Sequence, residues 1–501
     1  MMQRMTPWSP GGSPLTWPDY TLLAAALLLL IFLGLRFSSE QRSTRDFFLA
    51  QRRVPTWAAC LSFVATEVSA LTIIGVPATA YSENWQYAQF FVGSTLARFV
   101  LAALFIPAFY RYDCTTIYEF LGHRFGRATH VAGSVLFFIT RLLGSGVRLM
   151  AASLAVSILI GWGIIPTILL FTVVSIVYIA AGGVKAIVWT NVFQAGTFIL
   201  AGAATLVFLA TRIEGGLGAI IETAGGAGRL NIINWGPAPG DSDFWRRVLT
   251  DPNIVWLALL NGLVGSMAAF GTDHDLMQRL LTVETREQSQ RTLALTPLWS
   301  GLTLALYLAI GAGLYTFYAQ HPGLPLPRPD TIFPHFIGDT MPALLRGLML
   351  TAVVMASIDS PLGSLSASFV TDLYHPFRPG RSEQHYLRVS RLAVAGFGVV
   401  LAFLAYGFSF FEKILWLAFK IGGVTFGSLL GVFLLGLLTR RTADRANVLA
   451  MVVMASSNLV LLILSETKVL PFAWSWLILW GTAGTLGLAW VLGPLLDRGR
   501  P

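Results

Sequence analysis

The sequence predicts an all-helical integral membrane protein. Of its 501 residues, 55% are apolar and 12% are charged, and the mean hydropathy is +0.67. Soluble domains carry about 25% charged residues, so this composition is typical of a membrane protein. Apolar runs of roughly 20 residues, the length that crosses a bilayer as a helix, recur along the whole chain. The net charge of +9 does not indicate a nucleic-acid partner, because the basic residues lie between the apolar runs rather than in one patch.

We expect thirteen transmembrane helices. The first span, 20–37, is interpreted as a retained helix rather than a signal peptide, because only Arg4 precedes it and a basic stretch, not a cleavage site, follows it. The other spans are expected at 56–81, 87–110, 130–160, 165–182, 187–212, 252–271, 293–318, 341–371, 388–408, 414–438, 446–465 and 471–493. The polar segment 214–250 is expected to be a loop, which either caps an extracellular vestibule or only connects two spans.

The distribution of Lys and Arg predicts the topology. If the N-terminus lies outside, 21 of the 34 basic residues fall on the cytoplasmic side and nine fall outside. Cytoplasmic loops are the basic ones in membrane proteins. The sequence therefore predicts a multi-pass protein of the cell membrane (plasma or inner), with its N-terminus outside and its C-terminus in the cytoplasm. The protein is therefore expected to be embedded in the lipid bilayer.

Six ionisable residues fall inside the expected spans, where a charge is costly and therefore indicates function. They are Arg98, Arg141, Arg148, Lys420, Glu67 and Asp359. All other acids are assigned to loops or to span ends. Arg98 has a second interpretation, in which it lies near a helix end and extends its guanidinium to the lipid headgroups.

The fourth expected span carries two arginines on one face. Arg141, Gly144 and Arg148 are spaced i, i+3 and i+7, which places them in one stripe of a helix. The glycine leaves room between the two guanidinium groups, and guanidiniums bind a carboxylate or phosphate bidentately. The stripe therefore predicts an anion site. The alternative is that these arginines form interhelical ion pairs with Glu67 or with an acid in a loop.

Two spans combine small, hydroxylic and helix-breaking residues at membrane depth. The second expected span, 56–81, reads ATEVSALTIIGVP from Ala65. This pattern is typical of an unwound helix whose free carbonyl groups bind a cation, although small residues also permit close helix packing. The ninth span places Ser357, Asp359 and Ser360 within one turn, just before Pro361. Oxygen ligands with a neutralising carboxylate suit a hard cation such as sodium.

With these motifs the sequence resembles the sodium–solute symporter family, which includes sodium-coupled sugar, proline, sialic acid, iodide and monocarboxylate transporters. The resemblance covers nearly the whole chain and follows the family order. The motifs that carry it are ATEVSALTIIGVP, TTIYEFLGHRFG, AAGGVKAIVWTNVFQ, GTDHDLMQRLL, MASIDSPLGSLSASFVTDLY and GSLLGVFLLGLLTRR. The family has thirteen spans with an outer N-terminus, which is the topology that the charge distribution also predicts.

The resemblance implies a LeuT-type fold, in which two inverted repeats of five helices form the transport core. Residues 1–55 would then hold the outer N-terminus, the leading helix and a cytoplasmic loop, and 56–213 the first repeat. An extracellular loop, 214–251, would lead to the second repeat, 252–438. The two trailing helices and the cytoplasmic C-terminus would occupy 439–501.

The resemblance also implies a sodium ion between the first and eighth core helices. The ligands implied are the carbonyls of Ala65, Val68 and Val353 and the hydroxyl of Ser357. A second hydroxyl of the family site is missing, because this chain has Ala356. Members with a second sodium site carry an aspartate where this chain has Asn191. We expect Asp359, beside Ser360, to supply that carboxylate from another helix.

The substrate contacts of the family correspond to positions on several core helices. They are Glu67, Ser69 and Thr72 on the first, Gln89 on the second, Gly144 on the third and Ser266 on the sixth, with Lys420 on the tenth beside the substrate region. Arg141 and Arg148 lie one turn to either side of Gly144. We therefore expect an anionic substrate, with a carboxylate as its recognised group.

The sequence thus predicts a secondary active transporter that couples sodium entry to uptake of a small organic solute by alternating access. Sodium is the coupling ion, no other cofactor is expected, and a monomer is sufficient. One alternative is a proton-coupled or sodium-independent transporter in which Lys420 replaces a cation; another is a solute sensor. An enzyme is not expected, because the spans hold no nucleophile–base pair, and Cys60 and Cys114 lack metal-ligand spacing.

Overall fold

The computed structural model describes residues 15–38, 43–358, 361–411, 414–441, 443–470 and 472–497. Over these ranges the chain forms helices and no strand. Within the same ranges, ten helices are long and apolar enough to cross a membrane. The bent pair of α3 (Thr56–Glu67) and α4 (Ala70–Ser82) makes an eleventh candidate span. The predicted all-helical membrane fold is confirmed at this level.

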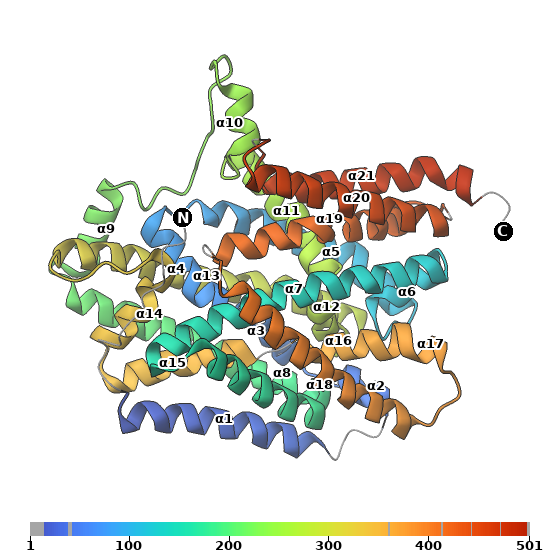
Figure 1. Ribbon diagram of the computed structural model, residues 1–501, viewed down its shortest axis with the longest axis horizontal. Helices are drawn as coiled ribbons and strands as arrows, with labels where there is room; N and C mark the ends of the chain where they lie inside the picture. The colour runs from blue at the N-terminus through green and yellow to red at the C-terminus, as the bar shows by residue number, and fades with distance from the viewer. Residues whose placement is uncertain are drawn as a thin grey trace.

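Most of the long helices run along the horizontal axis of Figure 1. The long helices are α1 (Trp17–Ser38), α5 (Tyr87–Arg111), α7 (Arg127–Ile160), α8 (Ile164–Arg212), α11 (Val255–Gly271), α13 (Arg286–Gln320), α18 (Glu383–Phe408), α19 (Ile414–Leu438), α20 (Asp444–Glu466) and α21 (Ser475–Leu496). Shorter elements connect them: α2 (Thr44–Leu49), η1 (Ala50–Arg52), α6 (Ile117–Arg124), α9 (Gly216–Gly226), α10 (Phe244–Thr250), α12 (His274–Leu281), α14 (Pro329–Thr340), α15 (Ala343–Ile358), α16 (Leu362–Ser368), η2 (Phe369–Tyr374) and α17 (His375–Phe377).

Helix α8 holds two of the expected spans. Its 49 residues, at about 1.5 Å each, exceed twice the ~30 Å hydrocarbon core of a bilayer. Gly183 interrupts the helix with φ 58° and ψ −159°, a conformation that glycine adopts readily because it has no Cβ. The interruption falls between the expected spans 165–182 and 187–212.

Two segments are more helical than the sequence predicts. The expected loop 214–250 contains α9 and α10, and α14 lies between two expected spans. Helices α9 and α10 have 11 and 7 residues, too few for their periodicity to separate them from a loop. Helix α14 begins at Pro329, where proline suits the first turn. It also contains Pro334, which argues against a helix in the sequence.

Close glycine contacts join α19 to α21, and we call this contact the α19–α21 seam. Gly423, Gly427 and Gly431 recur every four residues and so share one face of α19. A Cβ at Gly427 would lie 2.6 Å from the carbonyl oxygen of Ile478, and one at Gly431 would lie 2.8 Å from that of Thr482. Two backbones approach this closely only where side chains are absent. The seam therefore fixes α21 tightly against α19.

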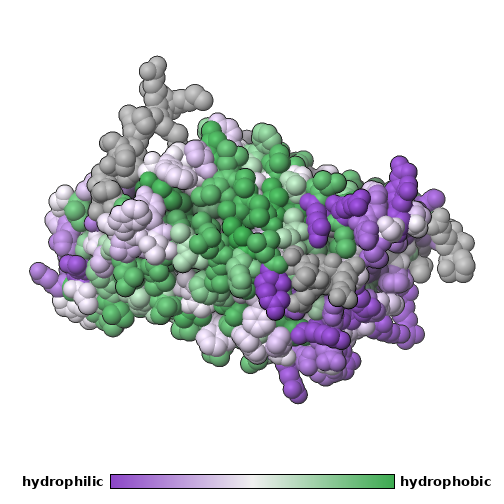
Figure 2. Space-filling model, turned by 90° about the horizontal axis from the view of Figure 1, so that it is seen from below, coloured by the Kyte–Doolittle hydropathy of each residue, from purple (hydrophilic) through white to green (hydrophobic). Residues whose placement is uncertain are grey.

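The surface has the pattern that a bilayer requires. Figure 2 shows a broad hydrophobic band across the middle of the molecule, with hydrophilic residues concentrated at one end. In Figure 1 that end holds α6, α17 and the C-terminal end of α21. Leu392 and Phe403 of α18 are 71% and 74% exposed, which suits a surface that faces lipid.

Candidate functional site

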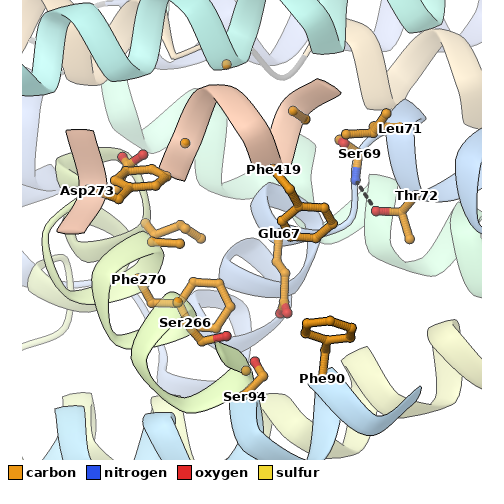
Figure 3. Close-up of a pocket in the computed structure, with 18 of the residues that line it drawn as sticks. Glu67, Ser69, Leu71, Thr72, Phe90, Ser94, Ser266, Phe270, Asp273 and Phe419 are labelled. Carbon is orange, nitrogen blue, oxygen red and sulfur yellow. Dashed lines mark hydrogen bonds between the residues drawn. The ribbon is translucent and has the colours of Figure 1, made fainter. Parts of the chain in front are cut away.

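A cavity of about 270 Å³ lies where α3, α5, α7, α11 and α19 meet (Figure 3). Its volume is just below the ~300–1,000 Å³ of typical ligand pockets, so it suits a small solute. Seven residues that were predicted to contact substrate line it: Glu67, Ser69, Thr72, Arg141, Gly144, Arg148 and Ser266. The structure therefore brings most of the predicted substrate residues to one place.

The chain bends by 57° between α3 and α4, beside this cavity. Val68 has an extended backbone, with φ −79° and ψ 107°. In a continuous helix the Ser69 amide would donate to the Ala65 carbonyl. Here it donates to Thr72 Oγ1 at 3.4 Å instead (Figure 3). The bend thus releases the Ala65 carbonyl from its helical hydrogen bond, as the predicted unwound segment requires.

A second break separates α11 from α12. The hydroxyl of Tyr118 donates to the carbonyl of Thr272 at 2.7 Å within this break. The side chain of Asp273 accepts a hydrogen bond from the Asp275 amide at 2.9 Å and caps α12. Val68 and Asp273 both line the cavity, so each broken helix places its interruption there.

Glu67 faces the cavity, and its charge is compensated. Its carboxylate forms an ion pair with Arg98 of α5, whose side chain is fully buried. It also accepts a hydrogen bond from Ser300 Oγ of α13 at 2.6 Å. The Arg98 guanidinium lies over the ring of Phe270, 4.9 Å from its centroid. The interpretation in which Arg98 extends to the headgroups is therefore wrong.

Arg141 belongs to a buried set of charges that we call the α7–α12 ionic network. Its guanidinium donates to Asp273 Oδ2 at 3.0 Å and also pairs with Asp275. Arg279 donates to the other Asp275 oxygen at 3.2 Å. An ion pair with an acid outside the spans was one of the two interpretations of Arg141. The sequence placed these acids merely at a span end, but Asp273 and Asp275 are each 1% exposed.

Arg148 donates to the carbonyl of Thr66 at 2.9 Å, which ties α7 to the unwound end of α3. Between the two arginines, a Cβ at Gly144 would meet nothing within 4 Å. The predicted space beside Gly144 is thus present, and both Arg141 and Arg148 line the cavity. An anion at this side of the cavity, which we call its charged end, would meet N–H donors of two guanidinium groups.

The residues predicted to bind sodium are described in part. The side chain of Ser357, together with Asp359 and Ser360, lies outside the described residues. Ala65 and Val353 are buried, and Val68 lines the cavity.

Asn191 of α8 is fully buried against α3. Its Nδ2 donates to Ser62 Oγ at 3.1 Å and to Thr66 Oγ1 at 3.0 Å. In this arrangement the amide joins two helices.

The other two predicted substrate residues lie away from the cavity. Gln89 of α5 donates to the carbonyl of Asn253 at 3.0 Å and accepts from the amide of Asn234 at 3.2 Å. It connects α5 to the segments on either side of α10. The ammonium of Lys420 lies 2.7 Å from Glu466 Oε1 and joins α19 to α20.

A separate buried polar cluster lies between α6, α7 and η2. Asp372 is fully buried and accepts hydrogen bonds from the hydroxyls of Thr116 and Ser368. His130 Nε2 lies 2.9 Å from Asp372 Oδ1. Burial and the nearby Asp372 charge raise the pKa of Glu119, which stands on α6, to about 7. This cluster is distinct from the cavity, since none of these residues lines it.

With this geometry in place, comparison with known proteins identifies the family. The model of the sodium:solute symporter family matches residues 47–454. The chain belongs to the sodium:solute symporter family. This symporter is 28% identical over 449 residues to the sodium/sialic acid symporter SiaT of Proteus mirabilis, over 87% of each chain. It is 27% identical over 440 residues to the sodium-coupled monocarboxylate transporter 1 of Homo sapiens, over 85% of this chain and 70% of that one.

A solved structure shares the fold of the symporter. The substrate-bound outward-open state of a Na⁺-coupled sialic acid symporter superimposes with a TM-score of 0.85. The match has 23% sequence identity and covers 96% of this chain and 98% of that chain. The predicted family and the predicted function class, sodium-coupled symport of a small solute across a membrane, are confirmed.

Sequence reasoning missed the aromatic side of the cavity. Phe90, Phe419 and Trp474 line it, but aromatic residues are common in apolar spans and none stood out. Trp474 also lies in the trailing segment, which was assigned outside the transport core. The acids Asp273 and Asp275 carried a usable signal, because a polar run interrupts the apolar pattern directly after the seventh span.

Proposed function

We propose that this symporter couples the inward movement of sodium to the uptake of a small organic anion, with a carboxylate as the recognised group. The observation that carries the proposal is the pair Arg141 and Arg148 on one face of α7, with open space at Gly144 between them. The relatives support it, since sialic acid and monocarboxylates are organic anions.

The α7–α12 ionic network offers a route from substrate binding to the conformational change. Arg141 faces the cavity and at the same time holds Asp273 at 3.0 Å. A substrate carboxylate would compete with Asp273 for this guanidinium. On our proposal, that competition loosens the link between α7 and α12 and favours the alternate, inward-open arrangement of the core.

The proposed sodium site lies at the bend between α3 and α4. The Ala65 carbonyl has lost its helical partner, and Val68 is extended beside the cavity. The Val353 carbonyl and the Ser357 hydroxyl complete the proposed ligand set. We retain Asp359 and Ser360 as candidate ligands of a second cation, with Asn191 in place of the usual aspartate.

We also propose a thirteen-span topology with an outer N-terminus and a cytoplasmic C-terminus. The proposed thirteen spans are the eleven candidate spans with α8 divided at Gly183 and with α15 and α16 counted as one more span. The repeats would be 56–213 and 252–438. We propose a monomer as the transport unit.

Sodium-driven uptake into proteoliposomes tests the proposal. An inward sodium gradient should drive accumulation of radiolabelled acetate, and an inward proton gradient without sodium should not. Arg141→Gln should abolish accumulation, because it removes a guanidinium from the charged end. Lys420→Gln is the matched control, since Lys420 pairs with Glu466 outside the cavity. Proton-driven uptake that depends on Lys420 would contradict the proposal and support the proton-coupled alternative.

A further inference from the structure

Part of the cavity lining is a cluster of stacked aromatic rings, and we infer that it selects a carboxylate with a flat apolar body over a hydroxylated one. We call Tyr87, Phe90, Phe419 and Trp474 the aromatic wall; all four line the cavity. The inference rests on the proposed function, because it takes the guanidiniums of the charged end as the carboxylate site. Trp474 is its central residue.

Within the aromatic wall, Trp474 stacks on both phenylalanines, and Tyr87 packs on them at a tilt. The ring of Trp474 stacks on Phe419, with centroids 5.1 Å apart and planes at 20°. It also stacks on Phe90, at 5.8 Å and 22°. Tyr87 contacts both phenylalanines at about 6 Å between centroids. Figure 3 shows the rings of Phe90 and Phe419 beside Glu67, with Asp273 on the far side of the pocket.

The position of Trp474 is fixed from three directions, although it precedes the last helix of the chain. The amide of Ala473 donates to the carbonyl of Leu249 at 2.8 Å. Asn261 of α11 donates from Nδ2 to the carbonyl of Ser475 at 2.7 Å. The α19–α21 seam begins immediately after, where a Cβ at Gly423 would lie 3.2 Å from Leu477 Cβ. The trailing helix therefore presents a rigidly held indole to the cavity.

A flat apolar body fits this wall better than a hydroxylated one. An aromatic ring against other rings gains packing energy beyond the burial of its area. A hydroxyl placed there would lose water and needs a new partner. Two polar lining residues, Asn261 and Ser300, are already engaged, since Asn261 donates to Ser475 and Ser300 donates to Glu67. The wall and the charged end together predict an amphipathic carboxylate as the substrate class.

Trp416 provides a matched control within the same cluster. Its ring lies 5.7 Å from that of Trp474. It is nevertheless not one of the described residues that line the cavity. Removing Trp416 disturbs the packing of the aromatic cluster but removes no contact with a bound solute.

Binding of benzoate, gluconate, acetate and benzamide to the purified protein in sodium chloride, measured by thermal-shift titration, tests the inference. Benzoate should bind more tightly than gluconate and acetate, and benzamide, which lacks the charge, should not bind. Trp474→Ala should weaken benzoate about tenfold and change acetate by less than about twofold. Trp474→Phe, which keeps a flat ring, should restore benzoate binding, and Trp416→Ala should leave it unchanged. A retained thermal shift with sodium alone shows that each variant is folded.

Tighter binding of gluconate than of benzoate would overturn the inference. So would equal effects of Trp474→Ala and Trp416→Ala, or equal weakening of benzoate and acetate by Trp474→Ala. In these cases sodium-driven acetate uptake would persist, and only the substrate class would be wrong. Loss of sodium dependence, or no carboxylate bound at all, would instead contradict the proposed function itself.

Discussion

Several buried charges in the described part of the chain are paired across helices. Glu67 pairs with Arg98 between α3 and α5. Asp19 of α1 accepts from Arg346 of α15 at 2.6 Å, and both side chains are buried. Taking a charge out of water costs several kcal/mol, and a partner must offset this cost. Each pair therefore fixes the position of one helix relative to another.

Breaking the Glu67–Arg98 pair tests this view. Arg98→Met should destabilise the folded protein by about 3–5 kcal/mol, because Glu67 then remains as an uncompensated charge. The double variant Glu67→Gln with Arg98→Met removes both charges and should recover most of that loss. Thermal unfolding in detergent of the single and double variants measures the coupling. Additive effects would show that the two residues do not act as a pair.

The raised pKa of Glu119 predicts that the stability of the folded protein depends on pH. Its pKa is about 7 in the folded protein against 4.5 for an ordinary glutamate. The folded state therefore binds more protons than the unfolded state between these values. Stability should fall as the pH rises from about 4.5 to about 7, by up to ~1.4 kcal/mol per pH unit from this group, and level off above that range.

Glu119→Gln should flatten this part of the stability profile, since the amide does not titrate. The surface-exposed Glu222 offers a control, because Glu222→Gln should leave the profile unchanged. Thermal unfolding across pH 4.5–8 compares the three proteins. Parallel profiles for Glu119→Gln and the wild type would refute the assignment to Glu119.

At the scale of elements, the α19–α21 seam holds the aromatic wall in place. Gly427→Ala would set a Cβ 2.6 Å from the Ile478 carbonyl oxygen and push α21 away. We expect a loss of about 1–3 kcal/mol in stability, together with weaker benzoate binding. Gly487→Ala on α21 is the control, since its Cβ meets nothing within 4 Å. Equal unfolding temperatures for the two variants would argue against a tight seam.

The elements differ in how far the sequence could predict them. Long apolar spans such as α5 and α20 were predicted to within a few residues, because lipid requires a continuous apolar run. The break at Val68 was predicted from small and hydroxylic residues around Glu67. The positions of Asp273 and Trp474 were not predictable in the same way. Whether a residue beside a span is buried at the cavity depends on how helices distant in the sequence pack together.

In the molecule as a whole, the cavity brings together residues from the trailing segment and from the transport core. Its aromatic wall includes Trp474, next to the trailing helix, and its charged end includes Arg141 of the α7–α12 ionic network. The unwound segment at Val68 lies beside both. On the proposed sites, solute, sodium and the link between α7 and α12 would act on one small region, which is the arrangement that coupled transport requires.

Sodium-coupled transport requires that sodium binds to the folded protein. The most direct test of sodium binding is the thermal stability of the purified protein in sodium chloride against equimolar N-methyl-D-glucamine chloride. A ligand specific for the folded state stabilises it by about 2.7 kcal/mol at 100 times its Kd. We predict a sodium-specific rise in the unfolding temperature that Ser357→Ala reduces. Ser364→Ala should not reduce it, because the wild-type Ser364 hydroxyl donates to the Pro361 carbonyl at 2.9 Å. Identical unfolding temperatures in the two salts would contradict sodium binding.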